Sequence, residues 1–186
     1  TLAGFLAGKF AGMQPFALSA TLTFEQTYSE IEGDSAAVAE LTAVLSSLAD
    51  LPIRQSLAVT GSVNQLGEIQ PIGGVNEKIE GFFESCKRRG LTGTQGVIIP
   101  ARNTKHLALN REVVVAVEEG TFAVYGVDHV EQALELLIGV PAGERGPEGT
   151  FPPESIYGRT AARLEEMAQI VANWGEGEEE PEKVTG

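Results

Sequence analysis

Apolar side chains recur along the chain with two different periods, which predict a mixture of strands and helices. Residues 18–24 alternate between apolar and polar side chains, the period-two pattern of a half-buried strand. Short apolar runs bounded by turn residues predict further strands at 57–60, 68–70, 96–99 and 122–127, the first two joined through 64–67.

Other segments follow the helical period. Behind Asp34 and Ser35, both good N-cap residues, an apolar face recurs at three- and four-residue spacings and comprises Val38, Leu41, Val44, Leu45 and Leu48. Further helices are expected after the Gly-Gly pair at 73–74, over 75–89, 102–119 and 128–138. This order of strands and helices indicates an α+β or α/β domain.

The chain changes character near residue 140. We therefore expect a main domain over 1–140, followed by a Pro- and Gly-rich linker at 141–153. The apolar residues of 154–174 have mixed three- and four-residue spacings, which predict an amphipathic helix. Residues 175–186 are rich in glutamate without aliphatic periodicity, and we expect them to form a disordered acidic tail.

Composition limits the classes of partner and site. The chain has 13 Lys and Arg against 26 Asp and Glu, a net charge of −13, which argues against nucleic acid or an anionic membrane as the main partner. Its longest apolar stretch, 2–10, contains Lys9 and is far shorter than the roughly 18 residues of a membrane helix. One cysteine, Cys86, and two histidines leave no disulfide framework and too few ligands for a zinc site. We expect a reduced, intracellular chain without a metal or cofactor of its own.

Several motifs are approximated but incomplete. Residues 4–9 resemble a phosphate-binding loop, but three residues separate the glycines instead of four, and Phe10 stands where Ser or Thr would hold magnesium. No G-x-S-x-G elbow, S-x-x-K or H-E-x-x-H motif is present. His106 and His129 lie in helix-like segments with charged neighbours, and we interpret both as surface histidines.

Lys78 and Ser35 each have a structural and a catalytic interpretation. On a helical projection Lys78 lies at the edge of an apolar face, and its i±3 and i±4 neighbours include no carboxylate. Its stem could simply cover apolar surface, whereas an amine buried beside Val75 and Phe82 would be neutral and basic. Ser35 could be a helix cap, or a nucleophile at a helix N-terminus, where unpaired N–H groups stabilise an oxyanion.

Five segments together resemble the proteolytic domain of Lon proteases, in the branch with Gly-Asp-Ser-Ala around the nucleophile. They are Phe24–Tyr28, Glu32–Ala36, Pro52–Gln55, Ala58–Gln65 and Gly67–Lys78. The resemblance extends from about Leu2 to Gly143 and implies the α+β fold of that domain. Ala37 departs from the branch, which often has Ser there. Lon domains also usually have strands upstream of the position of Thr1, so we expect this chain to be a piece of a longer protein that lacks those first strands.

The resemblance also implies roles for individual residues. It makes Ser35 the nucleophile and Lys78 the general base of a Ser–Lys dyad at the family's spacing. Thr60 matches a threonine that orients the lysine amine, while Glu32 and Asp34 lie in the acidic approach to the nucleophile. The implied chemistry is hydrolysis of a peptide bond through an acyl-enzyme.

The family further implies a setting for this chemistry. Its members cleave unfolded or damaged proteins as homohexamers in the cytoplasm, a task of protein quality control, and ATP would enter only through an ATPase module outside this chain. Two other classes stay open. One is a catalytically silent assembly or scaffold domain with the same fold, and the other is a Ser/Lys amidohydrolase acting on small molecules.

Overall fold

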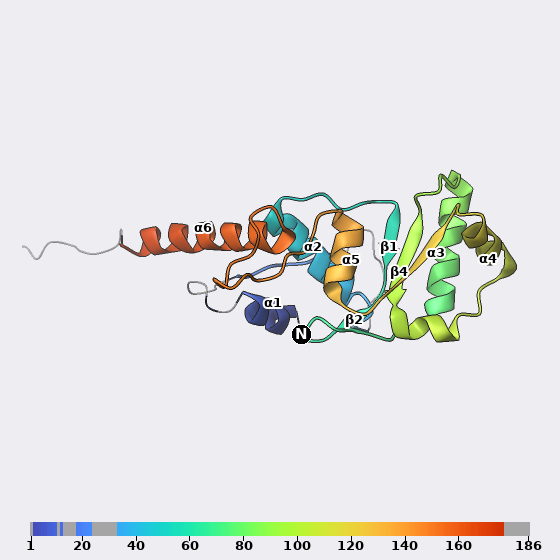
Figure 1. The fold of residues 1–186 in the computed structure, drawn as a ribbon, viewed down its shortest axis with the longest axis horizontal. Helices are drawn as coiled ribbons and strands as arrows, with labels where there is room; N and C mark the ends of the chain where they lie inside the picture. Colours follow the sequence, from blue (N-terminus) through green and yellow to red (C-terminus); the bar gives the residue numbers. More distant parts are fainter. Residues whose placement is uncertain (1, 11, 13–17, 24–32, 177–186) are drawn as a thin grey trace, which may run out of the picture.

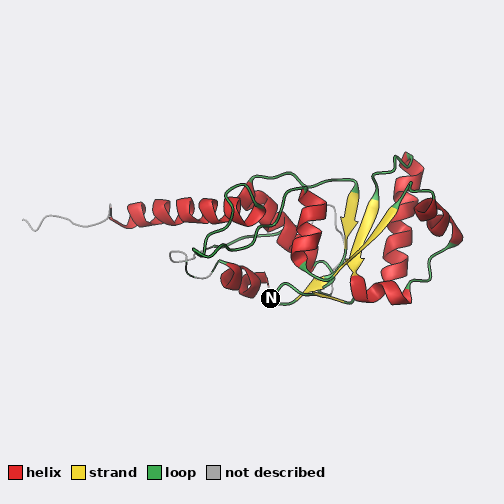
Figure 2. Cartoon of the chain, in the orientation of Figure 1, coloured by secondary structure: helices red, strands yellow, loops and turns green. Residues whose placement is uncertain are grey.

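The structure, a computed structural model, has a small parallel sheet at its centre. It describes residues 2–10, 12, 18–23 and 33–176. Strand β4 (Gly96–Pro100) lies between β1 (Leu57–Val59) and β5 (Ala123–Val127). All five residues of β4 are buried, as expected for a continuous apolar run in a parallel sheet that is covered on both faces. Helices lie on both sides of this sheet (Figures 1 and 2).

The two faces of β4 belong to two separate hydrophobic clusters. Ile98 packs in a cluster with four helices, α1 (Leu2–Lys9), α2 (Ala37–Ala49), α5 (Val130–Ile138) and the first part of α6 (Ile156–Glu176). Val97 and Ile99 pack in a second cluster with α3 (Val75–Arg89) and α4 (Arg111–Glu118). Since neighbouring side chains of a strand point to opposite faces, the sheet is the middle of three layers. This mixture of helices with a small parallel sheet confirms the expected α+β class.

A two-stranded hairpin adjoins the sheet. Strand β2 (Ser62–Val63) pairs antiparallel with β3 (Ile69–Gln70), and the Asn64 side chain accepts hydrogen bonds from the N–H groups of Leu66 and Glu68 in the turn. The predicted turn at 64–67 is therefore confirmed, but the prediction that it joins the strands at 57–60 and 68–70 is wrong. The partner of β3 is the short strand β2, which the sequence analysis missed, and β1 pairs with β4 instead.

Three local predictions are wrong. Residues 18–23 form no strand, because no described segment pairs with their backbone; residue 24 lies outside the described residues. The single helix expected at 102–119 is a 3₁₀ helix (Ala101–His106) and the separate helix α4. An extended connection divides them, and Asn110 caps α4 by accepting a hydrogen bond from Val113 N–H. Asp34 and Ser35 do not cap α2, which begins at Ala37 with Ala36 as its N-cap.

The region beyond residue 140 shares the core of the rest. Ala142, Ile156, Tyr157 and Leu164 are buried in the cluster around α2 and α5. The second half of α6 then extends away from the body (Figure 1), with Ile170 and Val171 exposed. The division near residue 140 stays a prediction, and most of the predicted acidic tail, from 177 on, lies outside the described residues. No helix in the described ranges is long and apolar enough to cross a membrane.

Candidate active site

Ser35 lies in the turn just before α2, and its backbone is tied to the end of β1. Its carbonyl oxygen accepts hydrogen bonds from Gly61 N–H at 2.8 Å and from Thr60 Oγ1 at 3.3 Å. The Gly61 carbonyl in turn accepts from Val38 N–H at 3.2 Å, in the first turn of α2. The turn that carries Ser35 is therefore held between a buried helix and the central sheet.

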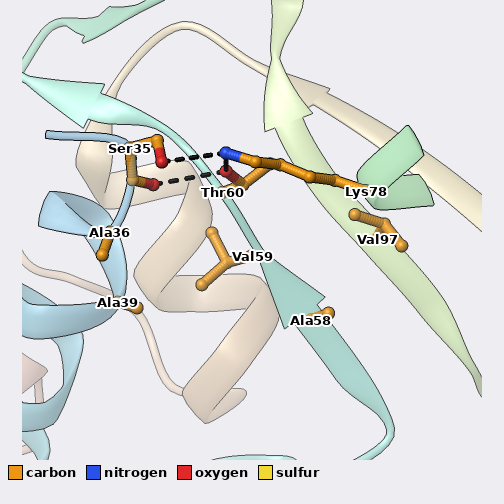
Figure 3. A pocket seen from close by; sticks show the side chains of 8 residues that line it. All are labelled: Ser35, Ala36, Ala39, Ala58, Val59, Thr60, Lys78 and Val97. Carbon is orange, nitrogen blue, oxygen red and sulfur yellow. Dashed lines mark hydrogen bonds between the residues drawn. The ribbon is translucent and has the colours of Figure 1, made fainter. Parts of the chain in front are cut away.

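Lys78 reaches the same point from the first turn of α3. Its Nζ lies 2.8 Å from Ser35 Oγ and 3.2 Å from Thr60 Oγ1, as Figure 3 shows. The start of α3 is held by a buried side chain, because the amide of Asn103 donates to Ile72 C=O at 2.9 Å and accepts from Ile72 N–H at 3.0 Å. Two residues far apart in the sequence thus meet, and Thr60 contacts both of them.

The surroundings of the Lys78 amine differ from the expectation in one respect. The side chain is exposed, so the prediction that Val75 and Phe82 bury it is wrong for this chain by itself. Val75 points into the cluster between α3 and the sheet, and Phe82 packs against Phe122, whereas the Lys78 amine reaches Ser35 and Thr60. Of the residues that the structure describes, no carboxylate lies within 4.0 Å of the amine. This agrees with the absence of a carboxylate neighbour on the helix.

A pocket of about 240 Å³ opens beside these groups. Its polar lining comes from Ser35, Thr60 and Lys78, and the rest is small and apolar: Ala36, Ala39, Ala58, Val59 and Val97. The hydroxyl and the amine therefore lie at the edge of a surface suited to an apolar side chain. Such a site can hold a chain segment whose carbonyl reaches Ser35 Oγ.

The neighbours of Ser35 in sequence are placed differently from one another. Asp34 accepts a hydrogen bond from Ser62 Oγ at 2.6 Å, a contact that the sequence analysis missed. No pattern in the sequence predicts this contact, because Ser62 lies outside the predicted strands and a lone serine has no characteristic spacing. Glu32, also named in the acidic approach, lies outside the described residues.

The remaining candidate groups are not part of this site. Neither His106 nor His129 lines the pocket, and His129 caps α5 together with Gln132. Residues 4–9 belong to helix α1 instead of a phosphate-binding loop, and Lys9 pairs with Glu131 at 2.5 Å. Cys86 is buried in the face of α3, and burial raises the pKa of its thiol, although Arg89 opposes this. Among the described residues no three His, Cys, Asp or Glu side chains come together as metal ligands.

Known proteins share the segments that build this site. The family model of the Lon protease (S16) C-terminal proteolytic domain matches residues 29–139, a range that includes Ser35, Thr60 and Lys78. The chain is 58% identical over 134 residues to a putative Lon protease homolog of Escherichia coli, covering 72% of this chain and 23% of that protein. It is 47% identical over 150 residues to a putative Lon protease homolog of Haemophilus influenzae, covering 81% of this chain and 25% of that protein.

A more distant relative comes from an archaeon. The chain is 39% identical over 125 residues to the archaeal Lon protease of Thermococcus kodakarensis, covering 67% of this chain and 17% of that protein. The chain thus spans about a quarter or less of the length of these curated relatives.

Proposed function

Because the chain belongs to the family of Lon protease C-terminal proteolytic domains, we propose that it is a serine endopeptidase with Ser35 as nucleophile and Lys78 as general base. The observation that carries the proposal is the 2.8 Å contact between Lys78 Nζ and Ser35 Oγ beside a pocket. A hydroxyl is a weak nucleophile by itself and needs an adjacent base, and no histidine lines this pocket.

In the first step the unprotonated Lys78 amine takes the Ser35 proton while Oγ bonds to the substrate carbonyl carbon. Thr60 suits this step, because its hydroxyl donates to Ser35 C=O and its lone pair accepts one Lys78 N–H. That arrangement leaves the amine lone pair for the serine proton. Thr60 therefore orients the base, and the pair Ser35 and Lys78 moves the proton.

Negative charge then develops on the substrate oxygen. The N–H groups of Ala37 and Val38 already donate to Asp34 C=O and Gly61 C=O. Those of Ser35 and Ala36 have no acceptor among the described residues, so they are the donors we propose for the oxyanion. Their place at the positive end of α2 favours an anion.

The intermediate collapses when Lys78 returns the proton to the leaving amine and the C–N bond breaks, which leaves an acyl ester on Ser35. Water then attacks the ester while Lys78 takes its proton. Lys78 returns that proton to Ser35 Oγ as the ester C–O bond breaks, which releases the second fragment as a carboxylic acid. These reaction steps need no metal or cofactor from the chain. We propose that ATP enters only through a module outside it.

The setting of the activity is also proposed. The relatives carry the name Lon protease, and we propose unfolded or damaged proteins in the cytoplasm as substrates and a homohexamer as the working assembly. The chamber enclosed by such a hexamer would cover the Lys78 amine, which the single chain leaves exposed, and burial favours the neutral base.

The test is cleavage of an unfolded casein-like substrate with and without a peptide boronate. We expect boronate-sensitive cleavage that is lost in Ser35→Ala and in Lys78→Ala. Two matched surface variants, Ser85→Ala on α3 and Lys105→Ala on the 3₁₀ helix, should keep it. No boronate adduct on Ser35 in an assembled sample would favour the silent scaffold, and turnover of small amides alone would favour the amidohydrolase.

A further inference from the structure

Ser62 is a buried hydroxyl residue beside the dyad that has no role in the chemistry described above. It begins β2, its exposed fraction is 6%, and its Oγ donates to Asp34 Oδ2 at 2.6 Å. Asp34 directly precedes Ser35, and its carboxylate is the acceptor of this bond. A hydroxyl that donates to a carboxylate makes a stronger bond than one between neutral groups. Ser62 therefore contacts the turn that carries the nucleophile.

The strand that carries Ser62 is a rigid support for this contact. Its backbone pairs with Gln70 in β3, and the next side chain, Val63, is 2% exposed in the core. The preceding residue, Gly61, packs so closely that an added Cβ would lie 3.2 Å from the side chains of both Val38 and Ile69. The position of the Ser62 hydroxyl is thus set by the core on one side and the hairpin on the other.

The turn at 33–36 has fewer contacts where Gly33 and Asp34 face solvent. Gly33 has a positive φ of 89°, and Asp34 is exposed. Backbone bonds hold the carbonyl of Asp34, to Ala37 N–H, and the carbonyl of Ser35, to Gly61 N–H. Among the described residues, the Ser62 hydroxyl is the group that holds the side chain of Asp34.

We propose that Ser62 is a positioning residue: through Asp34 it keeps the Ser35 hydroxyl within hydrogen-bond distance of the Lys78 amine. This inference rests on the proposed function of the dyad. Without the bond, Asp34 turns to solvent and the turn at 33–36 relaxes, which lengthens the 2.8 Å contact. A displacement of about 1 Å at a reacting group can lower a rate by about 100-fold.

The first test compares Ser62→Ala and Ser62→Thr with the unsubstituted protein in peptide hydrolysis. We expect Ser62→Ala to lower kcat by roughly 10- to 100-fold with KM changed by less than about twofold, because the pocket lining is untouched. Ser62→Thr keeps a hydroxyl and should recover most of the activity. Ser155→Ala is the matched control, since Ser155 is a buried serine at the start of α6 whose Oγ donates to Pro152 C=O. That variant should lose stability without losing kcat.

A double-mutant cycle separates positioning from general support of the fold. If Ser62 acts through Asp34, then Ser62→Ala should cause no further loss in an Asp34→Ala background. Independent, multiplicative losses in the two variants would overturn the inference, as would an unchanged kcat in a folded Ser62→Ala protein. If Ser62→Ala does not fold, the comparison of Asp34→Asn with Asp34→Ala decides. The asparagine keeps an acceptor oxygen, so a higher kcat than in the alanine variant supports the inference and an equal kcat overturns it.

The same assay tells the two hypotheses apart. Activity that persists in Ser35→Ala contradicts the proposed dyad, and the positioning role then fails with it. Activity that depends on Ser35 and Lys78 but is unaffected by the Ser62 variants contradicts the positioning role alone.

Discussion

Replacing Thr60 by valine removes one hydroxyl that serves both members of the proposed dyad. Thr60 is 9% exposed, accepts from Lys78 Nζ at 3.2 Å and donates to Ser35 C=O at 3.3 Å. Valine has nearly the same shape, so the pocket wall is kept and both hydrogen bonds are lost. The Ser35 carbonyl retains its shorter bond from Gly61 N–H, at 2.8 Å. The main loss is therefore the orientation of the lysine amine.

The size of the effect follows from these distances. Lys78 becomes charged as it takes the serine proton, and a hydrogen bond to a charged group contributes about 1.5–3 kcal/mol; the length of this bond and the exposure of Lys78 reduce that to about 1–2 kcal/mol. At about 1.36 kcal/mol per factor of ten, kcat should fall roughly 5- to 30-fold. Thr60→Ser keeps the hydroxyl and should stay close to the unsubstituted rate.

The assay is steady-state hydrolysis of a fluorogenic peptide, with unfolding in urea measured in parallel. Thr160→Val is the matched control, because Thr160 is fully buried and its hydroxyl donates only within α6, to Ile156 C=O at 2.8 Å. A full kcat in Thr60→Val would contradict the orienting role of Thr60, as would a Thr160→Val variant that loses as much kcat at equal loss of stability.

Other predictions concern pH and the core. Ile98→Ala, in the buried centre of β4, should lower the free energy of unfolding by about 2–5 kcal/mol in urea, and a much smaller loss would contradict the three-layer core. Burial acts to raise the pKa of Glu131, but hydrogen bonds from Lys9 and Tyr157 outweigh it, so the pKa lies below its ordinary value of 4.5. Its contribution to stability is thus complete above about pH 4.5 and is lost as the pH falls through the lowered value. Glu131→Gln should abolish this part of the acid sensitivity measured by urea unfolding, and an unchanged acid profile would speak against the ion pair.

Long segments with a strong helical period were predictable from sequence, since one apolar face dictates both the helix and the side that is buried. The helix at 75–89 agrees with α3. Of the apolar positions predicted behind Ser35, Val38, Leu41 and Leu45 are buried in α2, and Val44 and Leu48 pack partly buried against the same cluster. Strand pairing was less predictable. The alternation over 18–23 describes which side chains are apolar, but it does not provide a neighbouring strand.

The candidate site, too, was predictable only in part. Ser35, Thr60 and Lys78 were named from segments that resemble a known family, and the structure places them in contact. The packing around them was not readable from sequence. Val75 and Phe82 are near Lys78 along the helix, yet they pack toward the second cluster and leave the amine exposed. The Ser62 contact with Asp34 depends on a hairpin whose two strands have two residues each, which is too short to show an alternation of apolar and polar residues.

In the proposed mechanism Ser35 is a nucleophile that Lys78 makes reactive. The most direct measurement is intact-mass and peptide-mapping mass spectrometry of the protein after reaction with a fluorophosphonate, which phosphonylates an activated serine and releases fluoride. We expect one adduct, on Ser35, that is absent in Ser35→Ala and strongly reduced in Lys78→Ala but unchanged in Lys105→Ala. Labelling of another residue, or Ser35 labelling that is equally fast in Lys78→Ala, would contradict the Ser–Lys mechanism.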